Sequence, residues 1–219
     1  MPDLNEIVQK LAIWALPVLF AITLHEVAHG WVARYLGDNT AAAQGRLSLN
    51  PLQHIDPVGT ILVPGILLLL GGFLFGWAKP VPVDFRNLNN PKKDMALVAI
   101  AGPAVNLAMA IGWTVLLKIS LAQNPEAGVW LGIAQMSIAG ISINLVLMVL
   151  NLLPMPPLDG GRVAVGLLPM KQAIALSKLE PYGMVILIVA MATGVLGNIL
   201  GPLVGLSQTG LLSLFGING

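Results

Sequence analysis

The sequence contains no cysteine, few charged residues and few aromatic ones. None of the 219 residues is cysteine, and 10% are Asp, Glu, Lys or Arg. The lack of cysteine excludes disulfides and thiolate ligands, so any bound metal must be held by His, Asp or Glu. The net charge is +1, and no basic patch is interleaved with aromatic residues, so we expect no nucleic-acid partner.

Apolar residues dominate what remains. They make up 56% of the chain, and the mean hydropathy of +0.83 is far too high for a soluble domain of this length. Apolar runs long enough to cross a bilayer predict helices near 7–35, 94–119, 129–153 and 181–200, with weaker segments at 57–76 and 203–216. We therefore expect an all-α polytopic membrane protein, a bundle of about five to six transmembrane helices. No internal repeat or soluble insertion occurs, which predicts one membrane-embedded domain over residues 1–219.

The segment 57–76 is interrupted by Pro64-Gly65 and Gly71-Gly72, so it either spans the membrane or re-enters it. A re-entrant segment would put nine of the basic residues on one side and leave two, Lys10 and Lys118, on the other. The positive-inside rule makes the nine-residue side cytoplasmic. This hypothesis places the amino terminus outside and the carboxyl end of the first helix toward the cytoplasm.

The first apolar segment carries the run His25-Glu26-Val27-Ala28-His29, and no charged residue lies between Lys10 and Glu26. Imidazoles at positions i and i+4 project from one face of a helix and can share a zinc ion, while the glutamate between them can act as a general base. Ionisable side chains inside a membrane cost about 2.5–3.5 kcal/mol each, so a cluster of them needs compensation, and a bound cation supplies it. We favour a metal site over a hydrogen-bonded cluster without metal.

A zinc site needs a third protein ligand, and Asp159 is the strongest candidate. No histidine occurs in the seven residues after His29, and the later glutamates are poorly placed for the first helix. Asp159 follows the proline-rich stretch 154–157, which ends a helix and unwinds the backbone. Two imidazoles and one carboxylate leave an open position, as catalytic zinc requires. His54 is a competing candidate for the third ligand, but it would need a loop folded back onto the first helix. Considered without the first helix, Asp159 would be interpreted as an ordinary turn residue.

Three motifs together resemble the site-2 protease family of intramembrane zinc metalloproteases. They are the run from His25 to His29, the run Gly102-Pro103-Ala104-Val105-Asn106, and the stretch from Asn151 to Arg162. The chain is similar to the small prokaryotic members, which lack PDZ or nucleotide-sensing domains, with a catalytic core over about 7–162 and accessory helices over about 163–219. The resemblance implies that His25, His29 and Asp159 bind Zn²⁺, that Glu26 is the catalytic acid and base, and that Asn151 helps to hold substrate or the oxyanion.

The resemblance also implies an integral protein of a prokaryotic plasma membrane, whose partners are the lipid bilayer and the transmembrane helix of a substrate protein. A homo-oligomer is also compatible with the sequence. The segment 76–85 has proline at alternate positions, typical of an edge strand, and resembles a membrane-associated β-hairpin; we hypothesise that residues 77–85 pair with substrate, against a plain interfacial loop as the alternative. Asn106 and Asn144 are interpreted as polar contacts between helices and Gly102 as a packing residue, whereas Asn151, close before Asp159, fits a substrate or oxyanion role.

The competing function is a membrane protein that transports a metal ion or protons through the same ligands. Glu26 argues against it, because a transport site has no need of a carboxylate beside an open metal position. The chain also lacks the inverted repeat common in transporters. The sequence therefore favours regulated intramembrane proteolysis.

Overall fold

The described part of the chain is built from helices joined by short irregular segments. The computed structural model describes residues 3–62, 76, 78–123, 126 and 128–217. The long helices are α1 (Leu4–Tyr35), α4 (Pro91–Ala122), α5 (Gly128–Asn151) and α9 (Val195–Leu214). The shorter elements are α2 (Thr40–Ala43), η1 (Pro51–His54), η2 (Pro57–Leu62), η3 (Phe85–Asn87), α6 (Asp159–Leu167), α7 (Met170–Ser177) and α8 (Glu180–Ala192). The expectation of an all-α protein is confirmed for these residues.

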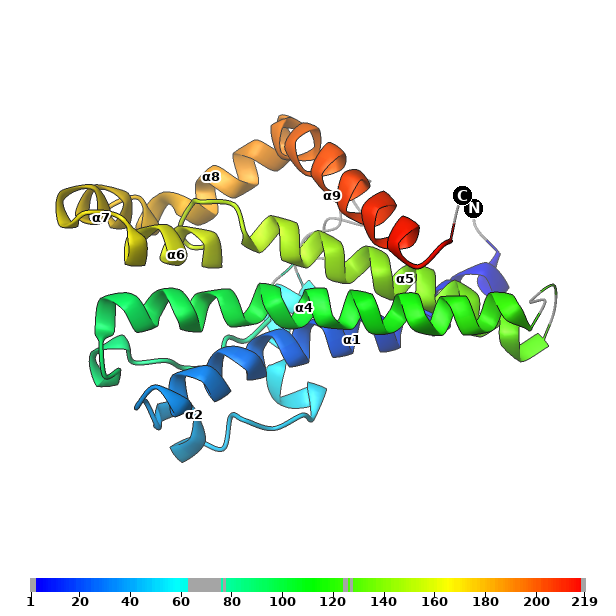
Figure 1. The fold of residues 1–219 in the computed structure, drawn as a ribbon, viewed down its shortest axis with the longest axis horizontal. Helices are drawn as coiled ribbons and strands as arrows, with labels where there is room; N and C mark the ends of the chain where they lie inside the picture. The colour runs from blue at the N-terminus through cyan, green and yellow to red at the C-terminus, as the bar shows by residue number, and fades with distance from the viewer. Residues whose placement is uncertain (1–2, 63–75, 77, 124–125, 127, 218–219) are drawn as a thin grey trace.

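Helices α1, α4 and α5 run side by side and form the centre of the molecule (Figure 1), with α4 packed against both of the others. The backbone N–H of Asn89, just before α4, donates to the carbonyl of Leu36, just after α1, at 2.9 Å. The chain therefore returns to the end of the bundle that it left. The predicted re-entrant segment 57–76 connects these two points, and most of it, residues 63–75, lies outside the described residues.

Four described helices are long and apolar enough to cross a membrane, or five if the bent pair α7 and α8 counts as one span. Within the described residues, the lower end of the predicted five to six helices is reached only if this pair counts as one span. Large apolar side chains on the outside of these helices, such as Trp14, Phe20 and Val115, are each more than a third exposed, as contact with lipid tails requires. This surface is compatible with a multi-pass membrane protein.

The predicted helix 181–200 is wrong in its boundaries, because two helices meet inside it. Helix α8 ends at Ala192, and α9 begins at Val195 after Gly194, whose φ of +76° lies in the left-handed region. Glycine adopts this conformation without steric cost and so permits a sharp turn in an apolar stretch. The two helices form the inverted V above α5 (Figure 1), and α9 packs back against α5.

Asp38 ties the end of α1 to two later segments. Its carboxylate is fully buried and accepts hydrogen bonds from the backbone N–H of Thr40 at 3.0 Å, the amide of Asn87 at 3.1 Å and the backbone N–H of Asp84 at 2.8 Å. Burial raises the pKa of this carboxyl, but the hydrogen bonds from Thr40, Asn87 and Asp84 outweigh burial and lower it below the usual value. The segment that leads to η3 is thereby anchored beside α1.

The predicted β-hairpin is absent from the described residues, since 78–84 is irregular and no strand is found there. Backbone donors of this segment bond elsewhere: Val81 N–H donates to a Glu26 carboxylate oxygen, and Lys79 N–H donates to the His54 carbonyl. Pro80 and Pro82 have no N–H to offer. The alternating prolines therefore produce an extended segment bonded to its neighbours instead of a paired strand.

Candidate metal centre

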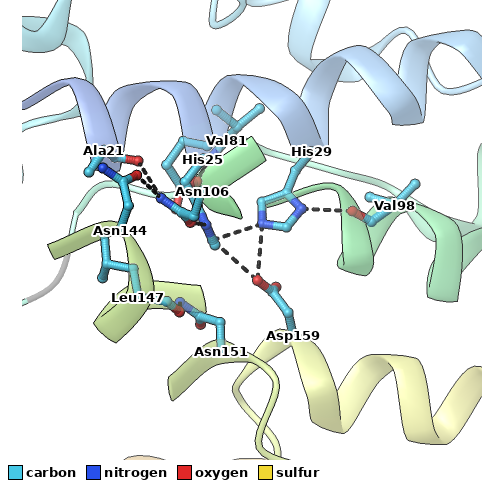
Figure 2. Close-up of polar contacts among 11 residues, drawn as sticks. Ala21, His25, His29, Val81, Val98, Asn106, Asn144, Leu147, Asn151 and Asp159 are labelled. Carbon is cyan, nitrogen blue, oxygen red and sulfur yellow. Dashed lines mark hydrogen bonds and ion pairs between the residues drawn. The ribbon is translucent and has the colours of Figure 1, made fainter. Parts of the chain in front are cut away.

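Two helices bring three potential metal ligands together. His25 and His29 project from α1, and Asp159 is the first residue of α6. Their ligand atoms form a nearly equilateral triangle (Figure 2): the two Nε2 atoms are 3.1 Å apart, and Asp159 Oδ2 lies 3.2 Å from His25 Nε2 and 3.3 Å from His29 Nε2. His25 and Asp159 are buried, and His29 is nearly so.

The opposite ring nitrogens decide which atoms of the imidazoles carry protons. His29 Nδ1 lies 2.7 Å from the carbonyl oxygen of Val98, which can only accept, so Nδ1 carries the proton. His25 Nδ1 lies 2.6 Å from Asn106 Oδ1 and likewise donates. In the neutral form of each ring, the proton on Nδ1 leaves the Nε2 lone pair facing Asp159.

The cluster fits a divalent metal ion. With both imidazoles neutral, three lone-pair atoms face one another, and Asp159 Oδ2 is a buried oxygen without a hydrogen-bond donor. This arrangement is repulsive unless a cation lies between the three atoms. Ligands held about 2.0–2.2 Å from a tetrahedral zinc ion lie about 3.3 Å from one another, which matches this triangle. Two neutral imidazoles and one carboxylate form a donor set that zinc accepts, with one position left open.

Gly102 of α4 makes this geometry sterically feasible. A Cβ atom at this position would lie 2.5 Å from both His25 Cε1 and His29 Nε2. The helix backbone therefore packs directly onto the two imidazole rings, and only glycine leaves them room. Asn106 follows one turn later on the same face of α4, so this face contacts both histidines.

A second pair of glycines delivers Asp159. A Cβ atom on Gly160 would lie 2.3 Å from the Leu152 carbonyl oxygen, and one on Gly161 would lie 2.3 Å from the Pro156 nitrogen. The start of α6 is thus pressed against the turn that follows α5. This close approach places the carboxylate of Asp159 opposite α1.

Glu26 lies on α1 between the two histidines and is half-buried. Its Oε2 atom accepts a hydrogen bond from the backbone N–H of Val81 at 2.8 Å. Gly30, one turn later, lets the chain come close, because a Cβ there would lie 2.8 Å from Val81 Cγ1. The extended segment 78–84 therefore passes over α1 beside the ligand cluster.

Two other residues named from the sequence lie apart from the ligand triangle. Asn151 is the last residue of α5, and its amide donates to the Leu147 carbonyl at 3.0 Å (Figure 2), so its role toward substrate stays a prediction. His54 is buried in η1, with Nε2 2.9 Å from the Ser48 carbonyl oxygen. The group of described residues able to hold a metal consists of His25, His29 and Asp159, without His54.

Sequence reasoning assigned Gly102 and Asn106 to helix packing and missed their contacts with the histidines. Asn106 does join helices, since its amide reaches α1 and α5, but its oxygen is also bonded to His25. The i,i+4 spacing of Gly102 and Asn106 could have predicted these contacts. It places a residue without a side chain and a polar residue on the same face of the helix, where another polar group can approach.

Comparison with known proteins agrees with this geometry. Over 200 residues the chain is 40% identical to "Putative zinc metalloprotease YwhC" of Bacillus subtilis, covering 90% of this chain and 88% of that protein. "Putative zinc metalloprotease Rip2" of Mycolicibacterium smegmatis is 32% identical over 82% of this chain and 66% of its own length. Rip2 of Mycobacterium tuberculosis (strain H37Rv) is 33% identical over 78% of this chain and 63% of its own length.

No family model and no solved structure matches the chain. The match to YwhC nevertheless extends over nearly the full length of both proteins, and the predicted resemblance is confirmed. The chain belongs to the site-2 protease family of zinc metalloproteases.

Proposed function

We propose that this protein is an intramembrane zinc metalloprotease that hydrolyses peptide bonds within or near the transmembrane segments of other membrane proteins. One observation carries the proposal: an apolar helical bundle holds the His25, His29 and Asp159 ligand triangle, and Glu26 lies between the two histidines on the same helix. Polar groups at this density inside apolar helices are costly and mark a functional site.

His25 and His29 from α1 and Asp159 from α6 would hold the zinc ion through Nε2, Nε2 and Oδ2. Zinc bound there would act as a Lewis acid, polarising the substrate carbonyl and lowering the pKa of a water molecule toward about 7. The names of the relatives support zinc as the metal. The hydrogen bonds from Nδ1 of each ring keep both imidazoles aimed at the same point.

Glu26 would move the protons of the reaction. It takes a proton from the attacking water as the water oxygen bonds to the carbonyl carbon, and it returns that proton to the amine nitrogen as the C–N bond breaks. The Val81 N–H holds Oε2 of Glu26, so Oε1 would be the oxygen that carries the proton.

The substrate would be a transmembrane helix that has unwound locally, because a helical carbonyl is already hydrogen-bonded and shielded from attack. Asn151, at the end of α5, would hold the substrate backbone or the oxyanion.

The lipid bilayer presents this substrate. The site would face the cytoplasmic side of a prokaryotic plasma membrane, because the positive-inside rule puts the side with nine of the basic residues in the cytoplasm. A reporter fused after Asn90 should be cytoplasmic, and an external location would contradict this orientation.

Cleavage by the purified full-length protein in lipid vesicles tests the function. We expect the wild type to cut a reporter protein with a destabilised transmembrane helix, and Glu26→Gln to retain zinc but lose activity by about 10²–10⁴-fold. Glu180→Gln, which changes an exposed glutamate of α8, is the control and should cleave normally. Equal cleavage by wild type and Glu26→Gln would remove Glu26 from the mechanism, and zinc transport without cleavage would favour the transporter alternative.

A further inference from the structure

Asn106 lies at the junction of three membrane-spanning helices and has no exposed surface. From α4 its amide nitrogen donates to the Ala21 carbonyl of α1 at 3.3 Å and to Asn144 Oδ1 of α5 at 2.9 Å. Its amide oxygen is 2.6 Å from His25 Nδ1. The amide oxygen and the amide nitrogen of Asn106 therefore each have specific hydrogen-bond partners (Figure 2).

A series of hydrogen bonds runs from the Gly140 carbonyl through Asn144 and Asn106 to His25. The backbone carbonyl at its start fixes which group is the donor in each of these bonds. Asn144 donates its amide nitrogen to the Gly140 carbonyl at 2.8 Å, which only accepts, so Asn144 Oδ1 must face Asn106. Asn106 must then point its nitrogen toward Asn144 and Ala21, and its oxygen toward His25. His25 can satisfy that oxygen only by carrying its proton on Nδ1.

We infer that Asn106 is a positioning residue for the metal centre: it fixes the tautomer and the ring orientation of His25, so that the Nε2 lone pair faces the metal. The inference rests on the zinc site of the proposed function. A metal-binding imidazole whose far nitrogen donates to a fixed acceptor is a stronger ligand, because the correct tautomer and ring angle are already selected before the metal binds.

The two histidines differ in a way that isolates this role. His29 obtains the same control from the backbone carbonyl of Val98, which no side-chain substitution removes. His25 depends on a side chain and can be tested directly. A role for Asn106 limited to joining helices would alter protein stability but would leave the zinc affinity of the folded protein unchanged.

The test measures the zinc affinity of the full-length protein in detergent, by competition with a chromophoric chelator, together with the visible absorption spectrum of the Co²⁺-loaded protein. Asn106→Leu removes the acceptor at similar volume, and we expect zinc to bind about 10–100-fold more weakly, with a changed Co²⁺ spectrum. Asn106→Asp keeps an oxygen for His25 and should bind zinc at least about 10-fold more tightly than Asn106→Leu. Thr114→Val removes another fully buried polar group of α4 and should bind zinc as the wild type does.

Each result has one meaning when unfolding temperatures establish that the variants are folded. Zinc affinity of Asn106→Leu equal to wild type, or an equal loss in Asn106→Leu and Asn106→Asp, would overturn the inference. If Asn106→Leu does not fold, Asn106→Ala, which also removes the acceptor, takes its place: zinc binding about 10–100-fold weaker than in the wild type supports the role, and wild-type affinity overturns it. A wild type that binds zinc but cleaves nothing would sink the proposed function and leave the inference standing; a wild type that binds no zinc would sink both.

Discussion

Gly102→Ala is the substitution that most directly tests whether α4 shapes the metal centre. The added methyl group would lie 2.5 Å from His25 Cε1 and His29 Nε2 and 2.7 Å from His25 Nε2. Favourable contacts between such atoms begin at about 3.5 Å, so the overlap is about 1 Å on two rings at once. Either the helix or the imidazoles must move.

The rings have little freedom to move, because His25 and His29 are each held at Nδ1 by a short hydrogen bond. Overpacking of this kind costs about 1–3 kcal/mol. Metal sites tolerate ligand shifts of only about 0.2 Å, so most of the strain should appear as weaker metal binding. At 1.4 kcal/mol for each factor of ten, we expect zinc affinity to fall about 5–150-fold.

Chelator competition gives the affinity, and cleavage of the reporter substrate gives the activity. Gly112→Ala is the matched control on the same helix, since its Cβ would meet nothing within 4 Å. That variant should bind zinc normally and gain up to about 1 kcal/mol of stability from helix propensity. Wild-type affinity and activity in Gly102→Ala would refute the close packing of α4 on the histidines.

Three further substitutions test other contacts of the site and its supports. Asp159→Asn removes the charge opposite both imidazoles, so zinc affinity in the chelator assay should fall by more than the 10–100-fold typical of an outer-shell partner; unchanged affinity would exclude Asp159 as a ligand. Val81→Pro removes the N–H that holds Glu26, and cleavage should fall about 10–100-fold with zinc retained. Val81→Ala keeps the N–H and should cleave much faster than Val81→Pro. Equal cleavage rates for these two variants would show that the Val81 hydrogen bond does not contribute to catalysis. Asp38→Asn should lower the free energy of unfolding by about 1–3 kcal/mol near pH 7. Because the folded-state pKa of Asp38 is lowered, that deficit should be full above about pH 4 and shrink as the pH falls further, and a pH-independent deficit in denaturant titrations would contradict the role of its carboxylate.

Local patterns in the sequence were sufficient for the helices and for part of the site. Helices α1, α4 and α5 begin and end within three residues of the predicted segments, because long apolar runs bounded by polar residues have few other structures open to them in a membrane. The pairing of His25 and His29 follows from helical spacing alone. Asp159 was reached by elimination, since so few His, Asp and Glu residues exist in the chain.

Other features depend on packing that no local pattern describes. The turn at Gly194 lies within a continuous apolar run, so composition does not reveal it. The alternating prolines of 78–84 suit a strand and an irregular extended segment equally well, and the choice was made by the Glu26 and His54 groups that bond this backbone. These partners lie far away in the sequence.

The sequence by itself therefore determined that the chain forms apolar helices, that two histidines share a helical face with a glutamate between them, and that the chain resembles the site-2 proteases. The tertiary structure decided what surrounds those histidines. Only the packing of α4 and α6 against α1 places Gly102 on the rings, Asn106 at Nδ1 and Asp159 at Nε2. The physical reason is that helical periodicity acts over a few residues, whereas a metal site requires atoms from distant segments to meet within a few tenths of an ångström.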